Sequence, residues 1–144
     1  MQVPSIIFRS NNADFKNADE VAAGPASDRA NKGLEQDKID NNISVLKRIA
    51  QILNKFKDYT VTIEGHANNV SGTEEEETST AGGNIPLEPL SQKRAEFVKT
   101  QLVKYGVDTS RLTAVGRGGR QPVVARADKD NWWKNRRVEF ILNK

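Results

Sequence analysis

The chain has one histidine and no cysteine, so few kinds of side-chain chemistry are open to it. The lack of cysteine excludes disulfides, thiolate nucleophiles and zinc–thiolate sites. A Ser-His-Asp set would have to centre on His66, and the sequence contains no G-x-S-x-G motif. The nearest acids, Glu64 and the run at 74–77, do not have a recognised ligand spacing around His66. The sequence therefore predicts a protein that is not an enzyme and that holds no metal or cofactor.

His66 lies in the stretch IEGHANNVSG at 63–72, which is typical of a loop at the end of a strand. Alternating apolar residues lead into Gly65, and Asn68 and Asn69 follow where a ligand-binding carboxylate would be expected. Asparagine side chains bond to nearby backbone groups in turns and offer donors and acceptors, but they carry no charge. The stretch suits a binding loop or a binding loop that has lost its charge, and the residues alone leave both readings open.

Two clusters nearer the C-terminus combine arginine with glycine or tryptophan. The first, GRGGR at 116–120, lacks the phosphate-loop pattern and occurs once, so it favours a turn between two core elements. The second, NWWKNRR at 131–137, suits either a stacking platform for single-stranded nucleic acid or a loop that packs two large aromatics beneath a strand. A net charge of +3 is too small to indicate polyanion binding, so we expect no nucleic-acid partner.

The first half of the chain contains signals for the elements that would position these residues. SIIF at 5–8, within a first strand at about 5–9, and YTVTIE at 59–64 are rich in β-branched and aromatic residues. Residues 10–35 are expected to form a long loop with a short helical turn, and the polar segment 66–88 a mobile surface loop. Between 36 and 57 the apolar residues fall three and four apart, which predicts an amphipathic helix: Ile39, Ile43, Leu46, Ile49, Ala50, Leu53 and Phe56.

The second half of the chain predicts another helix and two more strands. Ser91 follows Pro89 and is expected to cap a helix that stops at Gly106. The apolar face of that helix consists of Ala95, Val98, Leu102 and Tyr105. RLTAV at 111–115 and RVEFIL at 137–142 resemble strands, with a loop or short helix between them. The order of elements predicts an α/β fold, a two-layer sandwich of a mixed four-stranded sheet with helices packed on one face, in which both long crossovers join parallel neighbours.

The length of 144 residues suits one domain, and we expect residues 1–144 to form it. The start, MQVPSIIF, has no basic segment followed by an apolar one, so no signal peptide is predicted. No stretch approaches the roughly 20 apolar residues that are needed to cross a bilayer, so we expect no membrane span within the chain.

Four ordered motifs give the sequence a resemblance to a known family: GHAN at 65–68, LSQKRA at 90–95, GRGGRQP at 116–122 and NRRVE at 135–139. Together they resemble the OmpA-like C-terminal domain of outer-membrane porin-like proteins, peptidoglycan-associated lipoproteins and flagellar stator proteins. The match extends over 36–142 and implies the βαβαβ(α)β order of that family.

The resemblance implies a non-catalytic periplasmic domain, part of an outer-membrane-associated protein, that binds peptidoglycan and attaches the protein to the cell wall. The alternative is an OmpA-like fold that does not bind peptidoglycan. Such a domain would serve as a structural or protein-interaction module, with other envelope proteins as its partners.

The resemblance also implies a set of ligand-binding residues. The family's ligand is the peptidoglycan stem peptide, whose diaminopimelate, or another diamine in its place, needs a cation and an anion held a few ångströms apart. Arg94 stands at the arginine position of LSQKRA, where its fork suits a carboxylate. Asn11, at the end of the first strand, is a further polar candidate. Arg136 and Arg137 stand at the family's closing arginines, and one is expected to face the pocket while the other pairs structurally.

The ligand loop departs from the family pattern at its aspartate position. Asn68 occupies that position, and Ala67 precedes it in place of threonine. Loss of the ionic contact would remove roughly 1.5–3 kcal/mol, or about one to two orders of magnitude in affinity, so weakened binding is expected. The segment 69–89 could cover the pocket, supply a substitute carboxylate or meet a different partner, and the stem peptide could carry a different diamine such as ornithine; the sequence leaves these alternatives open.

Overall fold

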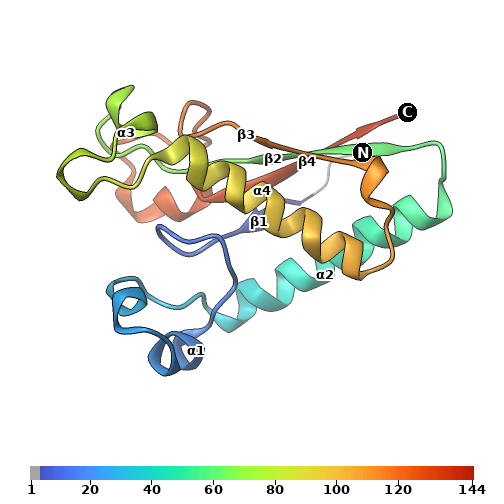
Figure 1. The fold of residues 1–144 in the computed structure, drawn as a ribbon, viewed down its shortest axis with the longest axis horizontal. Coiled ribbons are helices and arrows are strands. Elements are labelled where there is room, and N and C mark those ends of the chain that lie inside the picture. The colour runs from blue at the N-terminus through green and yellow to red at the C-terminus, as the bar shows by residue number, and fades with distance from the viewer. Residues whose placement is uncertain (1–3) are drawn as a thin grey trace.

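A four-stranded sheet forms the centre of the computed structural model, which describes residues 4–144 (Figure 1). Its strands are β1 (Ile6–Ile7), β2 (Thr60–Gly65), β3 (Leu112–Gly116) and β4 (Arg137–Asn143). They lie in the order β1-β4-β2-β3, with β4 antiparallel to β1 and β2, and β2 parallel to β3. The second crossover joins parallel neighbours as predicted, whereas the prediction for the first was wrong because β4 lies between β1 and β2. Residues 1–3 of the expected domain lie outside the described residues.

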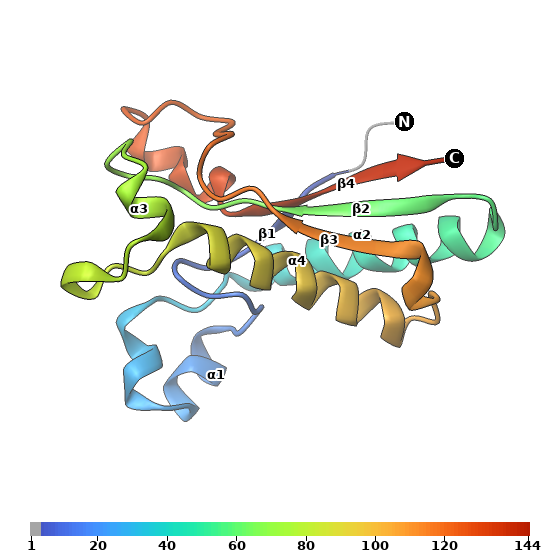
Figure 2. The same cartoon turned by 45° about the horizontal axis from the view of Figure 1, so that its top comes forward.

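Two long helices cover one face of this sheet (Figures 1 and 2). They are α2 (Gln36–Lys55) and α4 (Leu87–Lys104). Shorter helices lie in the connections, namely α1 (Ala18–Ala23), α3 (Glu75–Thr78) and the 3-10 segments η1 (Ala26–Ala30), η2 (Ala81–Gly83), η3 (Thr109–Arg111) and η4 (Lys129–Asn135). The predicted two-layer α/β sandwich is confirmed. Among residues 4–144, no helix combines the length and the apolar character needed to cross a membrane.

The main core fills the space between the sheet and the two long helices. Its helical residues are Val45, Leu46, Ile49, Ala50 and Leu53 from α2, and Ala95, Val98 and Leu102 from α4. Phe56 was assigned to the buried face of the first helix, but it is 46% exposed because α2 ends at Lys55. Tyr105 is likewise 37% exposed, since it lies just past the end of α4. Periodicity therefore predicted the helix interiors and failed at their C-terminal ends.

Asn42 is a buried polar residue on the apolar face of α2. Its Nδ2 donates to the Ile7 carbonyl at 2.8 Å, and its Oδ1 accepts from the Ile7 amide at 3.0 Å. Backbone groups in such places need hydrogen-bond partners, so Asn42 fastens the short edge strand to the helix layer. This contact places β1, which covers only two of the residues expected at 5–9.

The prediction that Ser91 caps the second helix was wrong. α4 begins at Leu87, with Pro86 as its N-cap, so Pro89 lies in the first turn, where its missing amide costs no helical hydrogen bond. Ser91 is instead a buried residue of the second turn. Its Oγ donates to the Glu88 carbonyl and accepts from the Gly118 amide, each at 2.8 Å. Ser91 thus ties the helix to the glycine-rich turn after β3.

The segments 10–35 and 66–88 hold more secondary structure than predicted. The first contains α1 and η1, and the second contains α3, η2 and the start of α4. α1 has a capping box, in which Asn17 Oδ1 accepts from the Glu20 amide at 2.8 Å and Glu20 Oε1 accepts from the Asn17 amide at 3.1 Å. Such short helices depend on local caps and tertiary contacts rather than on an apolar repeat, so periodicity could not identify them.

Candidate ligand-binding site

The predicted site residues come from different segments that meet at one end of the sheet (Figures 1 and 2). β1 and β2 point the same way, because both run antiparallel to β4, and their following loops meet the start of α4 at this end. A cavity of about 480 Å³ lies there. Asn11, Asn68, Arg94 and Arg136 all line this cavity, whereas Arg137 does not. We call it the Arg94 cavity.

Arg94 is fully buried and holds the two loops together. Its Nε donates to the Asn12 carbonyl at 3.0 Å, and its terminal nitrogens donate to the carbonyls of His66 at 2.9 Å and Arg9 at 3.1 Å. Burial, and to a lesser extent the charge of Arg136, lowers the pKa of Arg94 to about 9, so the guanidinium stays charged at neutral pH. Within residues 4–144, no carboxylate pairs with it.

The two closing arginines have different surroundings. Arg137 is buried and bonds Glu139 Oε1 and the Gln121 carbonyl, each at 2.9 Å. Arg136 is half-buried, and its Nε donates to the Phe8 carbonyl at 3.3 Å. Burial lowers the pKa of Arg136, and no carboxylate of the described chain forms an ion pair with it. Arg136 thus faces the cavity while Arg137 pairs within the protein.

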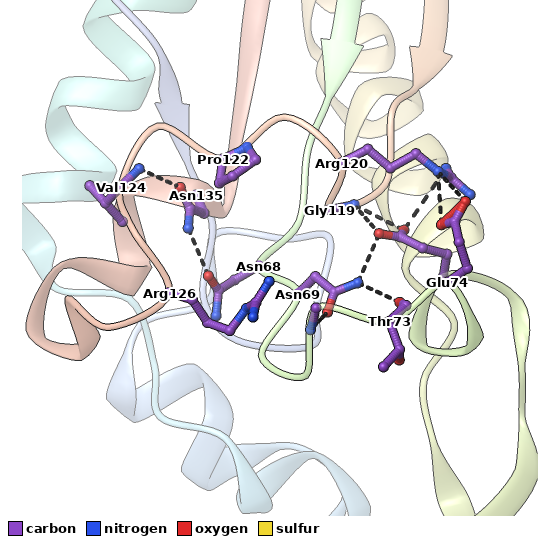
Figure 3. Close-up of a pocket in the computed structure, with 12 residues that line it drawn as sticks. Asn68, Asn69, Thr73, Glu74, Gly119, Arg120, Pro122, Val124, Arg126 and Asn135 are labelled. Atoms are coloured by element: carbon purple, nitrogen blue, oxygen red, sulfur yellow. Dashed lines mark hydrogen bonds and ion pairs between the residues drawn. The ribbon is translucent and has the colours of Figure 1, made fainter.

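Asn68 lies between the Arg94 cavity and a second cavity of about 450 Å³, which Figure 3 shows. Its Oδ1 accepts from Asn135 Nδ2 at 2.7 Å. Asn135 is buried, and its own Oδ1 accepts from the amide of Val123 at 2.8 Å. The same oxygen accepts from the amide of Val124 at 3.2 Å (Figure 3). The protein therefore already uses the carbonyl oxygen of Asn68. Sequence reasoning missed Asn135, because 67 positions separate the two side chains.

Asn11 lies at the exposed rim of the Arg94 cavity. Its φ of 57° places it in the left-handed region, which asparagine tolerates better than most residues. Its Nδ2 donates to Asn31 Oδ1 at 3.1 Å. Asn11 is thus held in place by the segment that follows α1.

The acidic run at 74–77 is bound to the glycine-rich turn after β3. Glu77 is only 1% exposed, and its carboxylate accepts from the Gly119 amide at 3.0 Å and from Asn69 Nδ2 at 3.0 Å (Figure 3). Arg120 pairs with Glu74 at 3.2 Å and with Glu88 at 2.6 Å. This segment was predicted to be a mobile loop, but Arg120 and the Gly119 amide bind its acidic side chains and bring the two stretches together.

Glu76 faces the other way, toward the Arg94 cavity, and sequence analysis did not single it out. Its Oε2 accepts from the Val70 amide at 3.1 Å, and its Oε1 accepts from the Ser71 amide at 2.9 Å. The Ser71 hydroxyl also donates to Oε1. Among the described residues that line this cavity, Glu76 is the only acidic one.

Glu64, His66 and Glu139 have ligand atoms within 4.8 Å of one another, so they are the residues best placed to hold a metal. The pairing of β2 with β4 puts the two glutamates side by side, which the sequence spacing did not show. However, Arg117 bonds Glu64 Oε2 at 2.8 Å and Arg137 bonds Glu139 Oε1 at 2.9 Å, so each carboxylate is already neutralised. Burial lowers the pKa of His66 to about 4 and keeps it neutral. We assign the cluster to joining the ends of β2 and β4.

Residues 9–31 form a lobe whose ion pairs support one wall of the Arg94 cavity. Arg9 is buried and bonds Asp14 at 2.7 Å and Asp28 at 2.9 Å, and Lys16 bonds Asp28 at 3.0 Å. Burial raises the pKa of Asp14, but hydrogen bonds from the Arg9 side chain and the Lys16 amide outweigh it and lower the pKa overall. Hydrogen bonds from Arg9 and then Lys16 lower the pKa of Asp28.

Acidification is expected to loosen this lobe before it affects the core. Groups with a depressed pKa stabilise the fold above their ordinary value of 3.8 and lose that contribution as the pH falls below it. Amide hydrogen exchange at pH 6 and pH 3, corrected for intrinsic rates, should show lower protection in residues 9–31 at pH 3 but little change in α2 and α4. An Asp28→Asn variant should show the same loosening at pH 6. Equal protection of the lobe at both values would contradict the expectation.

Comparison with known proteins identifies the family to which the chain belongs. The sequence model of the OmpA family matches residues 35–136. The chain belongs to the OmpA family. This membership confirms the predicted resemblance and the prediction that the protein is not an enzyme.

Individual relatives agree with this family. The peptidoglycan-binding protein ArfA of Mycobacterium tuberculosis is 33% identical over 131 residues, which cover 91% of this chain and 36% of ArfA. The peptidoglycan-associated lipoprotein of Brucella abortus is 35% identical over 99 residues, which cover 68% of this chain and 52% of the lipoprotein. The chain thus spans between about a third and about half of the length of these curated relatives.

Solved structures of other OmpA-type proteins share the fold. The peptidoglycan-associated lipoprotein from Burkholderia pseudomallei has a TM-score of 0.63 at 22% identity, over 96% of this chain and 89% of that one. The C-terminal domain of Helicobacter pylori MotB has a TM-score of 0.65 at 20% identity, over 99% of this chain and 86% of that one. At such identities the likeness concerns the fold alone, and it matches the mixed sheet with helices on one face.

Proposed function

We propose that the chain attaches an envelope protein to the cell wall by non-covalent binding of the peptidoglycan stem peptide. The names of two relatives refer to peptidoglycan and the name of a third refers to the outer membrane, which supports this role as part of an outer-membrane-associated protein. A domain with this role would lie in the periplasm. The observation that carries the proposal is the pair Arg94 and Arg136. Both residues line one cavity, and neither guanidinium group forms an ion pair within residues 4–144.

Two cations without a counterion in a partly enclosed cavity favour an anionic ligand. Removing a charge from water is costly unless an opposite charge or hydrogen bonds compensate it. The side chain of Arg94 is fully buried and three of its five N–H groups bind backbone carbonyls, so it contributes a positive charge beside the cavity. Arg136 makes its one side-chain hydrogen bond within residues 4–144 through Nε, so its terminal nitrogens lack a partner there and suit a carboxylate. The stem peptide supplies such carboxylates at diaminopimelate or at another diamino acid.

The alternative of a structural or protein-interaction module has less support. A structural or interaction module would be favoured if the loop at 68–88 closed the site, or if no concave surface lay beside Arg94. A cavity of about 480 Å³ lies beside Arg94, and the loop contributes to its lining. Asn11 and Asn68 add neutral polar groups to the same lining.

Binding to purified sacculi should depend on Arg136. Arg136→Gln removes the charge from a half-buried side chain that makes one hydrogen bond, so the fold should persist. A hydrogen bond to a charged group contributes about 1.5–3 kcal/mol, so the dissociation constant in co-sedimentation should rise by about 10- to 100-fold. Thermal unfolding of the variant should stay close to that of the wild type.

The matched control is Lys93→Gln, which removes the same charge from an exposed position of α4 outside the cavity. It should bind sacculi like the wild type. The proposal fails if the wild-type domain does not co-sediment, or if Arg136→Gln and Lys93→Gln bind equally well.

A further inference from the structure

We propose that Glu76 provides the carboxylate that binds the ammonium group of the ligand, in place of the charge that Asn68 lacks. This inference rests on the proposed function, because it concerns the same cavity. Asn68, Glu76, Arg94 and Arg136 all line that cavity. The site therefore presents two cations and one anion, which complements a ligand that carries carboxylates and an ammonium group.

The carboxylate of Glu76 is held in place by the loop that follows β2. Two backbone amides and one hydroxyl donate to it, from Val70 and Ser71. Because a carboxylate has about four acceptor positions, these three bonds leave one position open on Oε2. These donors hold the carboxylate in place before the ligand arrives.

Asn68 is less suited to this role, because its carbonyl oxygen carries no full charge and already accepts one hydrogen bond, from Asn135. An ammonium group needs an acceptor and gains most from a charged one. Glu76 is the carboxylate that the described part of the chain offers in the cavity. Ile85, Leu87 and Leu90 line the same cavity and add apolar surface that suits the methylene groups of a diamino acid.

The same hydrogen bonds would also suit a purely structural role, in which Glu76 only shapes the loop at 66–86. The two roles differ in their dependence on the ligand. A structural role changes the affinity for every ligand alike. An ammonium-binding role changes it only for ligands that have a free amine.

Calorimetry with two peptides separates these roles. The first is a stem tripeptide that ends in diaminopimelate with its side-chain amine free, and the second is the same peptide with that amine acetylated. The wild type should prefer the free amine by about 10- to 100-fold, which corresponds to one charge-assisted hydrogen bond. Glu76→Gln should lose this preference and bind the acetylated peptide like the wild type. Glu75→Gln, an exposed neighbour in α3, should behave like the wild type with both peptides.

A rescue variant strengthens the test. In Glu76→Gln/Asn68→Asp, a carboxylate returns to the position that Asn68 occupies, and tighter binding of the free-amine peptide than by Glu76→Gln alone is expected. A double variant that binds no more tightly contradicts the inference that the ammonium group binds in the part of the cavity that Asn68 lines.

The failures are distinguishable. If the wild type binds neither peptide, the proposed function and this inference both fall. If the wild type binds the free-amine peptide and Glu76→Gln binds it equally, or weakens both peptides alike, only the assignment of Glu76 is wrong.

Discussion

Gly65→Ala is expected to lower the free energy of unfolding by about 4 kcal/mol or more, which is at the upper end for a single substitution. A Cβ atom at Gly65 would lie 1.8 Å from the Ser91 carbonyl oxygen and 2.8 Å from its carbonyl carbon. Both atoms belong to the backbone of α4, so no flexible side chain can move aside. Relief would require the helix to shift away from β2, which would break the packing of the core.

Urea denaturation measures this loss directly, from the midpoint and slope of the transition. Gly24→Ala is the matched control. A Cβ atom there would meet its nearest atom, the Glu20 carbonyl oxygen, at 3.3 Å, and the φ of Gly24 is −90°, which alanine adopts without strain. The control should stay within about 1 kcal/mol of the wild type. Equal stabilities of Gly65→Ala and Gly24→Ala would show that β2 and α4 are not in such close contact.

Gly65 also shows what the sequence could and could not predict. Its position at the end of a strand followed from the alternating residues before it, and the same periodicity identified the interiors of α2 and α4. Its function in packing did not follow, because the contact with Ser91 joins two elements across the fold. Ser91 was wrongly interpreted as a helix cap because its contacts, too, join elements that are distant in sequence. A local pattern cannot show that its hydroxyl bonds Gly118, 27 residues further on.

Some residues of the candidate site could likewise be predicted from sequence motifs, whereas others are apparent only from their contacts in the structure. Motifs located Arg94, Asn68 and Arg136, and the structure brings these residues to one cavity. Glu76 and Asn135 were missed, because their contacts depend on how the acidic segment and the segment before β4 fold onto the loop after β2. Asn135 begins the NRRVE motif and Glu76 lies in the acidic run, but neither pattern shows which groups the two side chains contact. The sequence identified the acidic run as unusual, but only its contacts distinguish Glu76 from the buried Glu77.

Arg94→Met is expected to lower the free energy of unfolding by about 3 kcal/mol, although Arg94 is also a candidate ligand-binding residue. The substitution leaves the carbonyls of Arg9, Asn12 and His66 without their donor, at a cost of about 1–3 kcal/mol for each buried group. Removing a buried charge that has no counterion offsets part of this cost. Because the three carbonyls belong to the loops after β1 and β2, the variant should also separate those loops.

A thermal melt should show this loss as a fall of about 10 °C, whereas Arg136→Gln should melt within a few degrees of the wild type. Hydrogen exchange should then show lower protection around Arg9 and His66 in Arg94→Met. A variant that melts with the wild type would mean that Arg94 does not hold the loops. If the melt falls as expected, loss of sacculus binding by an Arg94 variant would not by itself demonstrate contact with the ligand. Arg136, which lines the same cavity but makes one bond to the protein, is therefore the residue at which binding and stability can be separated.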